Sequence, residues 1–309
     1  MSHPANDQVT DSDLDQLEEG LARASDIMER AIATHTPSAI IGLFSGGHDS
    51  YTVTHFVAEN FPNYLATVAH IDTGIGIPET QQFVIDRCNA HDWPLKIYRA
   101  VENTNAKGEP DPQVFDDLVL KWGFPGPYGH GMMYFRLKDR AIQRITREYG
   151  EPIMLISGCR KEESSRRMGN TAEIQDRGKQ VWVAPFTYMT GSDCAAYMSL
   201  HELPKNEVKE KLCMSGECLC GAFAKKNELK EIEFWYPEVG KRIRDLEIKV
   251  REAGFPWGWE ETPPPWWSAR KKAAKAGQTD AFEAEANAEI EMLCQSCHRK
   301  HELAERGIT

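Results

Sequence analysis

The segment Ser45-Gly46-Gly47-His48-Asp49-Ser50 follows a short apolar run and precedes a helical pattern. Glycines at such a place let the backbone turn sharply and approach a ligand without Cβ collisions. The N–H groups at the start of the helix, supported by the helix dipole, favour an anion. The hydroxyls of Ser45 and Ser50 offer further hydrogen bonds to phosphate oxygens. The segment therefore predicts a phosphate-binding loop, although it matches neither GxxxxGK[ST] nor GxGxxG.

A second segment, residues 158–167, places arginines directly after another apolar run. Gly158 provides the turn, and the planar guanidinium groups of Arg160 and Arg167 suit bidentate contact with a polyphosphate. Taken alone, the same arginines also fit a surface charge run. Lys138, on a basic helical stretch, is a weaker candidate for phosphate contact, because its position does not separate it from a solvated lysine.

Five of the eight cysteines lie in the C-terminal third of the chain: Cys213, Cys218, Cys220, Cys294 and Cys297. Grouped cysteines in a chain without an export signal indicate metal or redox chemistry rather than disulfides. Only the last pair has the CxxC spacing of a zinc knuckle, whereas an iron–sulfur cluster needs four thiolates at less regular spacing. Two ligand sets are open: the last four cysteines, which leaves Cys213 as a spare thiol, or the first three with one of the last pair. The single Cys88, Cys159 and Cys194 are expected to be small buried side chains.

The hydrophobic pattern predicts the elements that position these segments. Short apolar runs predict buried parallel strands at 39–44, 65–71, 95–100, 153–157 and 181–186. Helical patterns lie at 11–35, 50–60, 78–91 and 132–149. This alternation predicts an α/β fold with an open, doubly wound and mostly parallel sheet. In such sheets ligands bind at the carboxyl ends of the strands, so the two segments should meet at one edge.

The pattern divides the chain into an N-terminal helix (1–36), an α/β domain (37–204) and a helical, cysteine-bearing region (205–309). In the last of these, 228–253 is helical and charged. The tryptophans between Trp257 and Trp267, followed by the basic run from Arg270 to Lys275, fit either a nucleic-acid groove or a packed core.

The charge balance restricts the class of protein. Against 47 Asp and Glu stand 36 Lys and Arg, which gives a net charge of −11. This balance argues against binding nucleic acid or anionic lipid by bulk charge, but not against a local basic groove. No apolar run approaches the roughly 20 residues of a membrane span, and the acidic start resembles no targeting signal. We therefore expect a cytoplasmic protein without membrane contact.

Three segments in the same order resemble the PP-loop ATP pyrophosphatases, whose signature SGGxDS matches residues 45–50. Residues 70–74 and 78–80 are similar to the DTG…PET pattern of that superfamily, whose loop contacts the adenosine portion of the nucleotide. Residues 158–167 are similar to its GxRxxES-x-x-R segment. The chain looks most similar to the phosphoadenylyl-sulfate (PAPS) reductase branch, and within it to the iron–sulfur ATP pyrophosphatases of DNA phosphorothioation. The resemblance implies an adenine nucleotide alpha hydrolase-like fold.

The resemblance also implies an ATP site with Mg²⁺ bridging phosphate oxygens near Asp49. Catalytic roles would fall to Ser45, Asp49, Ser50, Arg160 and Arg167. The nucleotide would contact Ser45, Gly46, Gly47, His48, Asp49, Ser50, Asp72, Thr73, Gly74, Lys138, Gly158, Arg160, Ser164 and Arg167. For the five grouped cysteines, the resemblance favours a 4Fe-4S cluster over Zn²⁺.

The implied function is adenylation of an acceptor for sulfur transfer. It would involve a sulfur donor protein of the cysteine desulfurase kind and a nucleic-acid acceptor, either a DNA backbone or a tRNA base. One alternative is a PAPS or adenylyl-sulfate reductase that produces sulfite, and another is an ATP-binding assembly subunit without turnover. The resembled reductases carry a catalytic cysteine in an ECGxH-type tail, whereas no cysteine follows Cys297 here. Iron–sulfur reductases have adjacent cysteines, which Cys218-Leu219-Cys220 only approximates, so both departures favour the pyrophosphatase.

Overall fold

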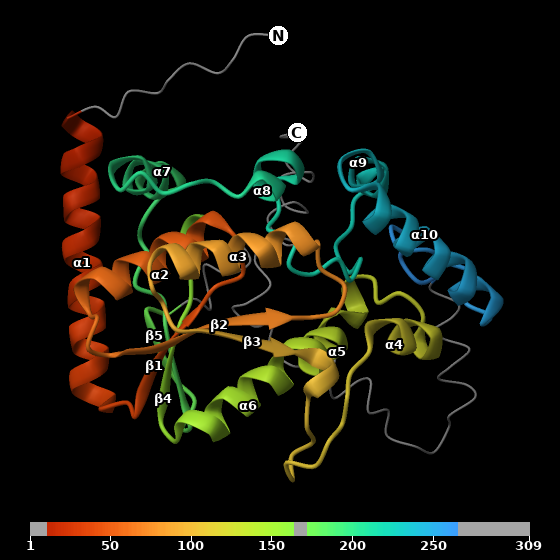
Figure 1. The fold of residues 1–309 in the computed structure, drawn as a ribbon, viewed down its shortest axis with the longest axis horizontal. Coiled ribbons are helices and arrows are strands. Elements are labelled where there is room, and N and C mark those ends of the chain that lie inside the picture. The colour runs from red at the N-terminus through yellow and green to blue at the C-terminus, as the bar shows by residue number, and fades with distance from the viewer. Residues whose placement is uncertain (1–10, 164–171, 265–309) are drawn as a thin grey trace.

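The computed structural model describes residues 11–163 and 172–264 (Figure 1). The strands are β1 (Ala39–Leu43), β2 (Leu65–Asp72), β3 (Leu95–Arg99), β4 (Ile153–Ile156), β5 (Ile174–Asp176) and β6 (Gln180–Val183). The α-helices are α1 (Asp11–His35), α2 (His48–Asn60), α3 (Pro78–Ala90), α4 (Phe115–Trp122), α5 (His130–Tyr134), α6 (Arg140–Tyr149), α7 (Gly191–Leu200), α8 (Glu207–Leu212), α9 (Glu228–Trp235) and α10 (Pro237–Glu252). Short helical turns are η1 (Ala100–Glu102), η2 (Pro127–Gly129), η3 (Phe135–Asp139) and η4 (Lys161–Glu163).

The strands form one six-stranded sheet in the order β3-β2-β1-β4-β6-β5. All neighbouring pairs are parallel except β5 and β6, which are antiparallel. The prediction of an open, mostly parallel α/β sheet is therefore confirmed. The sequence pattern does not predict β5, because this edge strand has only three residues and none of them is fully buried.

The strand order reverses beside β1. From β1 the chain passes through α2 to β2 and through α3 to β3, and it then returns to the other side of β1 as β4. The carboxyl ends of the two strands that flank such a reversal are the usual place for a ligand. The predicted phosphate loop follows β1 and the arginine segment follows β4, so the topology brings both to this point.

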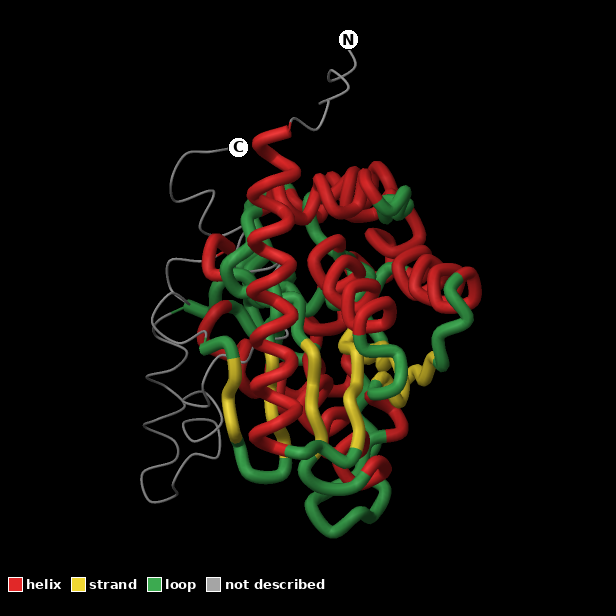
Figure 2. Tube along the Cα trace, turned by 90° about the vertical axis from the view of Figure 1, so that its left-hand side faces the viewer, coloured by secondary structure: helices red, strands yellow, loops and turns green. Residues whose placement is uncertain are grey.

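Helices cover both faces of the sheet, which explains why every residue of β1 is buried. On one face α1, α2 and α7 share a core cluster with Ile40 of β1 and Met154 of β4. On the other face Ile142 of α6 packs with Ile41 and Leu155, whose side chains point the opposite way. Figure 2 shows α1 running alongside the strands. Its bounds agree with the helix that the sequence predicts.

The basic helical stretch 132–149 differs from a regular α-helix. It begins as α5 at His130, passes through a π-helical turn, η3, and continues as α6. A π turn inserts an extra residue into the helix, and such turns are frequent at functional sites. Lys138 lies in this turn.

The described part of the C-terminal region packs on the loops at the carboxyl edge of the sheet rather than standing apart. One core cluster joins Ile75 and Ile77 with residues of α8, α9 and α10. The charged stretch 228–253 is two helices, because Pro237 lacks an amide hydrogen and disfavours helical geometry at the residue before it. The division of the chain at residue 204 stays a prediction.

The structure decides between the two interpretations of the first tryptophans. Trp257 and Trp259 are buried, at 2% and 1% exposure. Their indole N–H groups donate to the backbone oxygens of Phe124 at 2.8 Å and Leu219 at 2.6 Å. These two tryptophans therefore form a packed core and not a nucleic-acid groove, while Arg270 to Lys275 lie outside the described residues. In the part of the chain that the structure describes, no helix is both long and apolar enough to cross a membrane.

Three histidines gather where α2, α3 and α7 meet. The ring centroid of His55 lies 5.1 Å from that of His91 and 5.1 Å from that of His201. His55 is 5% exposed, and its Nδ1 forms a hydrogen bond of 2.9 Å with the Tyr197 hydroxyl. Burial, and then the two neighbouring imidazoles, lower the pKa of His55 to about 4. The packing of these three elements thus requires a neutral His55.

This shift predicts a loss of stability in mild acid. Below the ordinary imidazole pKa of 6.5, His55 binds a proton in the unfolded chain, whereas in the folded protein it stays neutral down to about pH 4. The stability that a neutral His55 contributes is therefore complete above pH 6.5 and is lost as the pH falls from 6.5 to about 4. His55→Asn keeps a hydrogen-bond partner for Tyr197. We expect this variant to lose about 2 kcal/mol less unfolding free energy than the wild type between pH 7 and pH 5.

Urea unfolding at the two pH values measures the difference. His35→Asn, outside the cluster, controls for the loss of one imidazole. Equal pH dependence in the wild type and His55→Asn would contradict the proposed role of burial.

Candidate functional site

The predicted phosphate loop, residues 45–50, connects β1 to α2. Gly46 has φ 82°, in the left-handed region that favours glycine, and Gly47 is the N-cap of α2 with an extended backbone. No side chain caps the helix, and the first helical hydrogen bond runs from the Tyr51 amide to the Gly47 oxygen at 3.0 Å. The loop thus presents a helix start that suits an anion.

Ser45 and Ser50 hold the shape of this loop. Their hydroxyl oxygens lie 3.0 Å apart, and the Ser50 hydroxyl donates to the Gly47 oxygen at 2.9 Å. The amide of Ser45 donates to the Ser50 hydroxyl at 3.3 Å. The two side chains therefore bond within the loop, and their contact with phosphate stays a prediction.

The second predicted segment meets the first turn of α2. At Gly158 a Cβ atom would lie 2.7 Å from the amide nitrogen and 2.9 Å from the Cα of Ser50, and 2.8 Å from the carbonyl carbon of Asp49. These atoms belong to the backbone and cannot move aside as a flexible side chain would. Glycine is therefore required at 158 for the end of β4 to lie against the phosphate loop.

Arg160 connects the same two segments by charge. It is 2% exposed, and its Nε donates to Oδ1 of Asp49 at 2.9 Å. One of its terminal nitrogens donates to Glu162 at 2.9 Å, and that carboxylate also accepts the amide of Gly191, the first residue of α7, at 2.6 Å. The structure thus brings Asp49, Gly158 and Arg160 together, whereas Ser164 and Arg167 lie outside the described residues.

A second loop at the carboxyl edge, residues 72–80, follows β2. The Asp72 carboxylate accepts the amide of Gly74 at 2.8 Å, and the Thr73 hydroxyl donates to the backbone oxygen of Glu217 at 3.1 Å. Arg242 of α10 donates to the Gly74 oxygen at 2.8 Å. Contacts from the C-terminal region therefore fix the loop that the resemblance assigns to adenosine.

The cysteine-bearing loop, residues 213–220, lies against both of these loops. The amide of Ile77 donates to the Gly216 oxygen at 2.7 Å, and the Thr80 hydroxyl donates to the Ser215 oxygen at 2.5 Å. The Cβ of Ser215 lies 3.5 Å from where a Cβ on Gly47 would stand. The phosphate loop, the adenosine loop and the cysteine-bearing loop thus form one site.

Asn206 is a site residue that the sequence analysis does not identify. It is 2% exposed and caps α8 by accepting the amide of Val208 at 3.0 Å, while its Nδ2 donates to the Gly46 oxygen at 2.8 Å. A Cβ on Gly46 would lie 3.4 Å from this nitrogen and 2.6 Å from Thr80. The pattern Asn206-Glu207 before a helix signals a cap, but not a second bond to a loop 160 residues earlier.

Lys138 forms a buried ion pair. Its Nζ lies 2.9 Å from Oε2 of Glu217, and the two side chains are 3% and 8% exposed. Removing one partner of such a pair typically costs about 3–5 kcal/mol, because the other charge stays buried. Lys138 thus joins the π turn to the cysteine-bearing loop, and its contact with phosphate stays a prediction.

His48, at the first position of α2, lies beside Glu210 of α8. Burial lowers its pKa, and Glu210 of α8, 3.5 Å from Nε2, acts in the opposite direction. The lowered pKa favours a neutral imidazole, so His48 would contact a phosphate as a hydrogen-bonding group rather than as a cation.

The described cysteines differ in exposure. Cys213 is exposed, Cys218 is half-buried, and Cys220 is 2% exposed within an apolar cluster. Across residues 11–163 and 172–264, no three His, Cys, Asp or Glu side chains converge as they would around a metal ion. As they stand, the described thiols do not make a cluster site, and Cys294 and Cys297 lie outside the described residues. By contrast, Cys88, Cys159 and Cys194 are buried as predicted.

Residues 39–240 match the family model of the phosphoadenosine phosphosulfate reductase domain. The chain belongs to this family. The match includes the phosphate loop, the arginine segment and the cysteine-bearing loop, and it makes the α/β sheet a PP-loop nucleotide-binding fold. It does not select the phosphorothioation branch, which stays a prediction. No curated protein matches the chain.

Solved structures with a similar fold have low sequence identity. A PAPS reductase from Candida auris in a phosphate complex is 17% identical, with a TM-score of 0.45, over 67% of this chain and 94% of that one. An FMN adenylyltransferase from Candida glabrata with FAD and inorganic pyrophosphate is 12% identical, with a TM-score of 0.45, over 68% of this chain and 65% of that one. An NH3-dependent NAD synthetase from Campylobacter jejuni is 13% identical, with a TM-score of 0.46, over 80% of this chain and 98% of that one. Identities this low say nothing about a shared substrate.

The contact at Gly158 predicts a specific loss of nucleotide binding. We expect Gly158→Ala to push β4 away from the first turn of α2 and to weaken ATP binding by at least about tenfold, or about 1.4 kcal/mol. Titration with a fluorescent ATP analogue measures the affinity. Gly191→Ala is the matched control, because a Cβ there meets its nearest atom at an ordinary 3.7 Å. Equal affinities of the two folded variants would refute this account of the site.

Proposed function

We propose that this protein is an ATP pyrophosphatase that adenylates an acceptor for sulfur transfer. One observation carries the proposal: a PP-loop with an arginine-bound aspartate lies in van der Waals reach of a loop that carries three cysteines. Nucleotide chemistry and sulfur chemistry would then share one site. A nucleic acid would be the acceptor, and a cysteine desulfurase-like protein would supply the sulfur.

In the adenylation step an acceptor oxygen attacks the α-phosphorus of ATP, and pyrophosphate leaves. Backbone N–H groups at the start of α2 would hold the pyrophosphate, and Arg160 would neutralise developing charge beside it. A Mg²⁺ ion that enters with the nucleotide would supply positive charge to the leaving group. Asp49 would be the carboxylate that holds this ion. Catalysis would thus consist mainly of positioning and charge neutralisation.

In the sulfur step Cys213 would act as a persulfide carrier, because it is the exposed thiol of the cysteine-bearing loop. The terminal persulfide sulfur attacks the activated atom of the acceptor and displaces AMP, which leaves a disulfide between acceptor and Cys213. A thiol reductant then cleaves this disulfide, releases the thiolated acceptor and leaves the oxidised reductant. No step in this scheme requires a 4Fe-4S cluster or Zn²⁺, and a cluster that includes Cys294 and Cys297 remains part of the sequence-based hypothesis.

The family itself supports a second candidate, reduction of adenylyl sulfate or its 3′-phosphorylated form to sulfite. This reaction would use the same nucleotide site, with a cysteine thiolate attacking the sulfur of the sulfonucleotide. Sulfite formed from adenylyl sulfate with a thiol reductant, and no pyrophosphate formed from ATP, would select the reductase. Tight ATP binding without either product would select the non-catalytic assembly subunit.

Pyrophosphate release from ATP tests the adenylation step. Under anoxic conditions, and with candidate acceptors present, we expect Asp49→Asn to reduce release by at least about 100-fold, because it removes both the metal-holding charge and the charged partner of Arg160. Asp86→Asn, on the outer side of α3, is the control for loss of one carboxylate. Unchanged release in folded Asp49→Asn would rule out this role.

Cys213→Ser separates sulfur transfer from adenylation. We expect this variant to release pyrophosphate at the wild-type rate while incorporation of ³⁵S from a persulfide donor into the acceptor falls below detection, because serine cannot carry a persulfide. Cys88→Ser, at a buried thiol in the core cluster that contains residues of α1, α2 and α7, controls for loss of a cysteine. Full sulfur incorporation by Cys213→Ser would exclude Cys213 as the carrier.

A further inference from the structure

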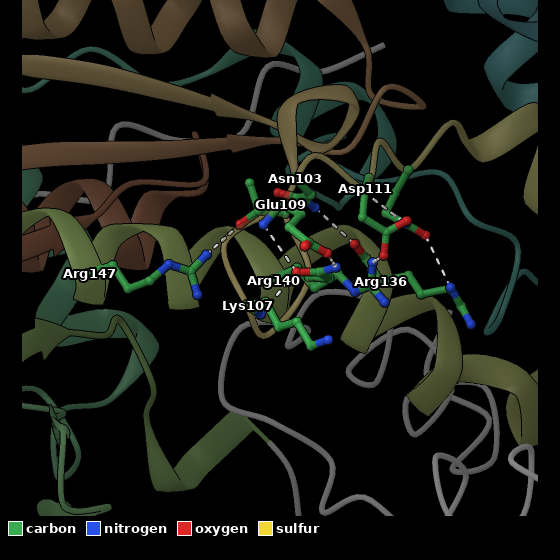
Figure 3. Close-up of polar contacts among 10 residues, drawn as sticks. Asn103, Lys107, Glu109, Asp111, Arg136, Arg140 and Arg147 are labelled. Atoms are coloured by element: carbon green, nitrogen blue, oxygen red, sulfur yellow. Dashed lines mark hydrogen bonds and ion pairs between the residues drawn. The ribbon is translucent and has the colours of Figure 1, made fainter.

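A row of arginines lies along the helix formed by η3 and α6, on the side that faces residues 99–113. The row consists of Arg136, Arg140, Arg144 and Arg147. Figure 3 shows Arg136, Arg140 and Arg147 reaching toward this covering segment from the helix. The sequence shows a basic helix here but does not show what covers it.

Each arginine of the row donates to an acceptor on the covering segment. Arg136 contacts Oε1 of Gln113 at 3.3 Å, and Arg140 pairs with the carboxylate of Asp111. Arg144 donates to Oε2 of Glu102 at 3.1 Å and to the Arg99 oxygen at 3.0 Å, and Arg147 donates to the Thr104 hydroxyl. The segment thus supplies carboxylate, amide, hydroxyl and carbonyl oxygens along one line of guanidinium groups.

The covering segment is anchored at its two ends, and between them its residues form hydrogen bonds with one another. Asn103 and Gln113 are buried, and Asn103 donates to the Arg136 oxygen at 2.9 Å. Between them, Asn105 accepts the amide of Glu109 through its side chain at 3.1 Å, and Gly108 turns the chain with φ 83°. The span 104–111 can therefore leave the arginines without losing its internal hydrogen bonds.

The ion pairs between the covering segment and the arginine row are partly open to solvent. Glu102 and Asp111 are 46% and 37% exposed, whereas their partners Arg144 and Arg140 are 20% and 13% exposed, so water reaches each pair mainly from the carboxylate side. Ion pairs that are open to water contribute about 0–1 kcal/mol each. Arginine forks, in contrast, match phosphate oxygens closely. From Arg136 to Arg147 the helix rises about 16 Å, which corresponds to about five phosphates of one strand.

The helix that carries the row also contacts the nucleotide site. Lys138, two residues after Arg136, is paired with Glu217 of the cysteine-bearing loop. At the start of the covering segment, Nε of Arg99 lies 3.9 Å from Oδ2 of Asp72 in the adenosine loop. An elongated anion laid along the row would therefore have one end near the site of adenylation. With a net charge of −11, the chain can attract such a ligand only through a local row of this kind.

We infer that the arginine row of residues 136–147 binds the phosphate backbone of a nucleic acid, and that segment 102–113 covers the row by competing for the same guanidinium groups. This inference rests on the proposed function, since it gives the acceptor a place on the protein. Binding of the polymer then exchanges the oxygen ligands that this segment gives to the arginines for phosphate oxygens, while Asn103 and Gln113 keep the two ends of the segment in place.

Two double variants of the full chain test the inference, with a 30-nucleotide fluorescent single-stranded DNA, the same RNA and the corresponding duplexes as probes. Glu102→Gln with Asp111→Asn weakens the cover. Its control is Glu109→Gln with Asp117→Asn, which removes the same charge from exposed positions in the segment and in the neighbouring α4, and releases no arginine of the row.

The second variant, Arg140→Gln with Arg147→Gln, removes half of the row. Its control is Arg23→Gln with Arg30→Gln on α1, which packs on the opposite face of the sheet. Circular dichroism and thermal melting establish that every variant is folded.

We expect fluorescence anisotropy at low salt to show about tenfold tighter binding for the cover variant than for its control. The row variant should bind about tenfold more weakly than its control, and for single strands its salt slope should fall by about 1.4. Three outcomes overturn the inference: equal binding by the cover variant and its control, equal binding by the row variant and its control, or equally tight binding of polyglutamate of the same charge.

Pyrophosphate release from ATP, measured on the same proteins, separates the two claims. Release without nucleic-acid binding refutes the inference and leaves the proposed adenylation intact. Binding that depends on the row, with no release for any acceptor, contradicts the proposed function instead.

Discussion

The approach of Gly158 to the first turn of α2 is the contact on which the rest of the site depends. It lets the carboxyl ends of β1 and β4, adjacent strands in the sheet, bring their following segments into van der Waals contact. Only at that separation can Arg160, two residues later, reach Asp49 while it stays buried. A methyl group at position 158 would oppose both contacts at once, because the atoms that it would meet belong to the backbone of α2.

The same edge of the sheet fixes the position of the cysteine-bearing loop. Hydrogen bonds from the Ile77 amide and the Thr80 hydroxyl, together with the buried pair of Lys138 and Glu217, attach this loop to three different elements. A buried ion pair does not stabilise a fold better than an apolar pair would, but it specifies one arrangement, since any shift leaves a charge unpaired. The thiols therefore have a defined place relative to the phosphate loop.

Much of this architecture can be predicted from the sequence. The buried strands are short runs of β-branched and apolar residues, and their parallel order follows from the alternation with helices. The phosphate loop and Gly158 are visible because glycine marks places where backbones meet. The helix at 11–35 and the strands at 39–43 and 65–72 agree with their predicted bounds to within one residue. Such features are local, and their signal is carried by the residues that form them.

The remaining features depend on partners distant in the chain. The sequence pattern identifies Asn206 only as an ordinary helix cap, and it is the fold that brings its side-chain Nδ2 to the Gly46 oxygen. Main-chain hydrogen bonds, such as that from Ile77 to Gly216, leave no trace in side-chain type. For Trp257 and Trp259 the residue types are clear from the sequence but their role is not. Clustered aromatic residues fit a binding surface and a core equally until their burial is known. The arginine row belongs to the same class: its spacing indicates a charged helix face, and the acceptors that cover it lie in a segment whose own sequence shows only turn residues and scattered acids.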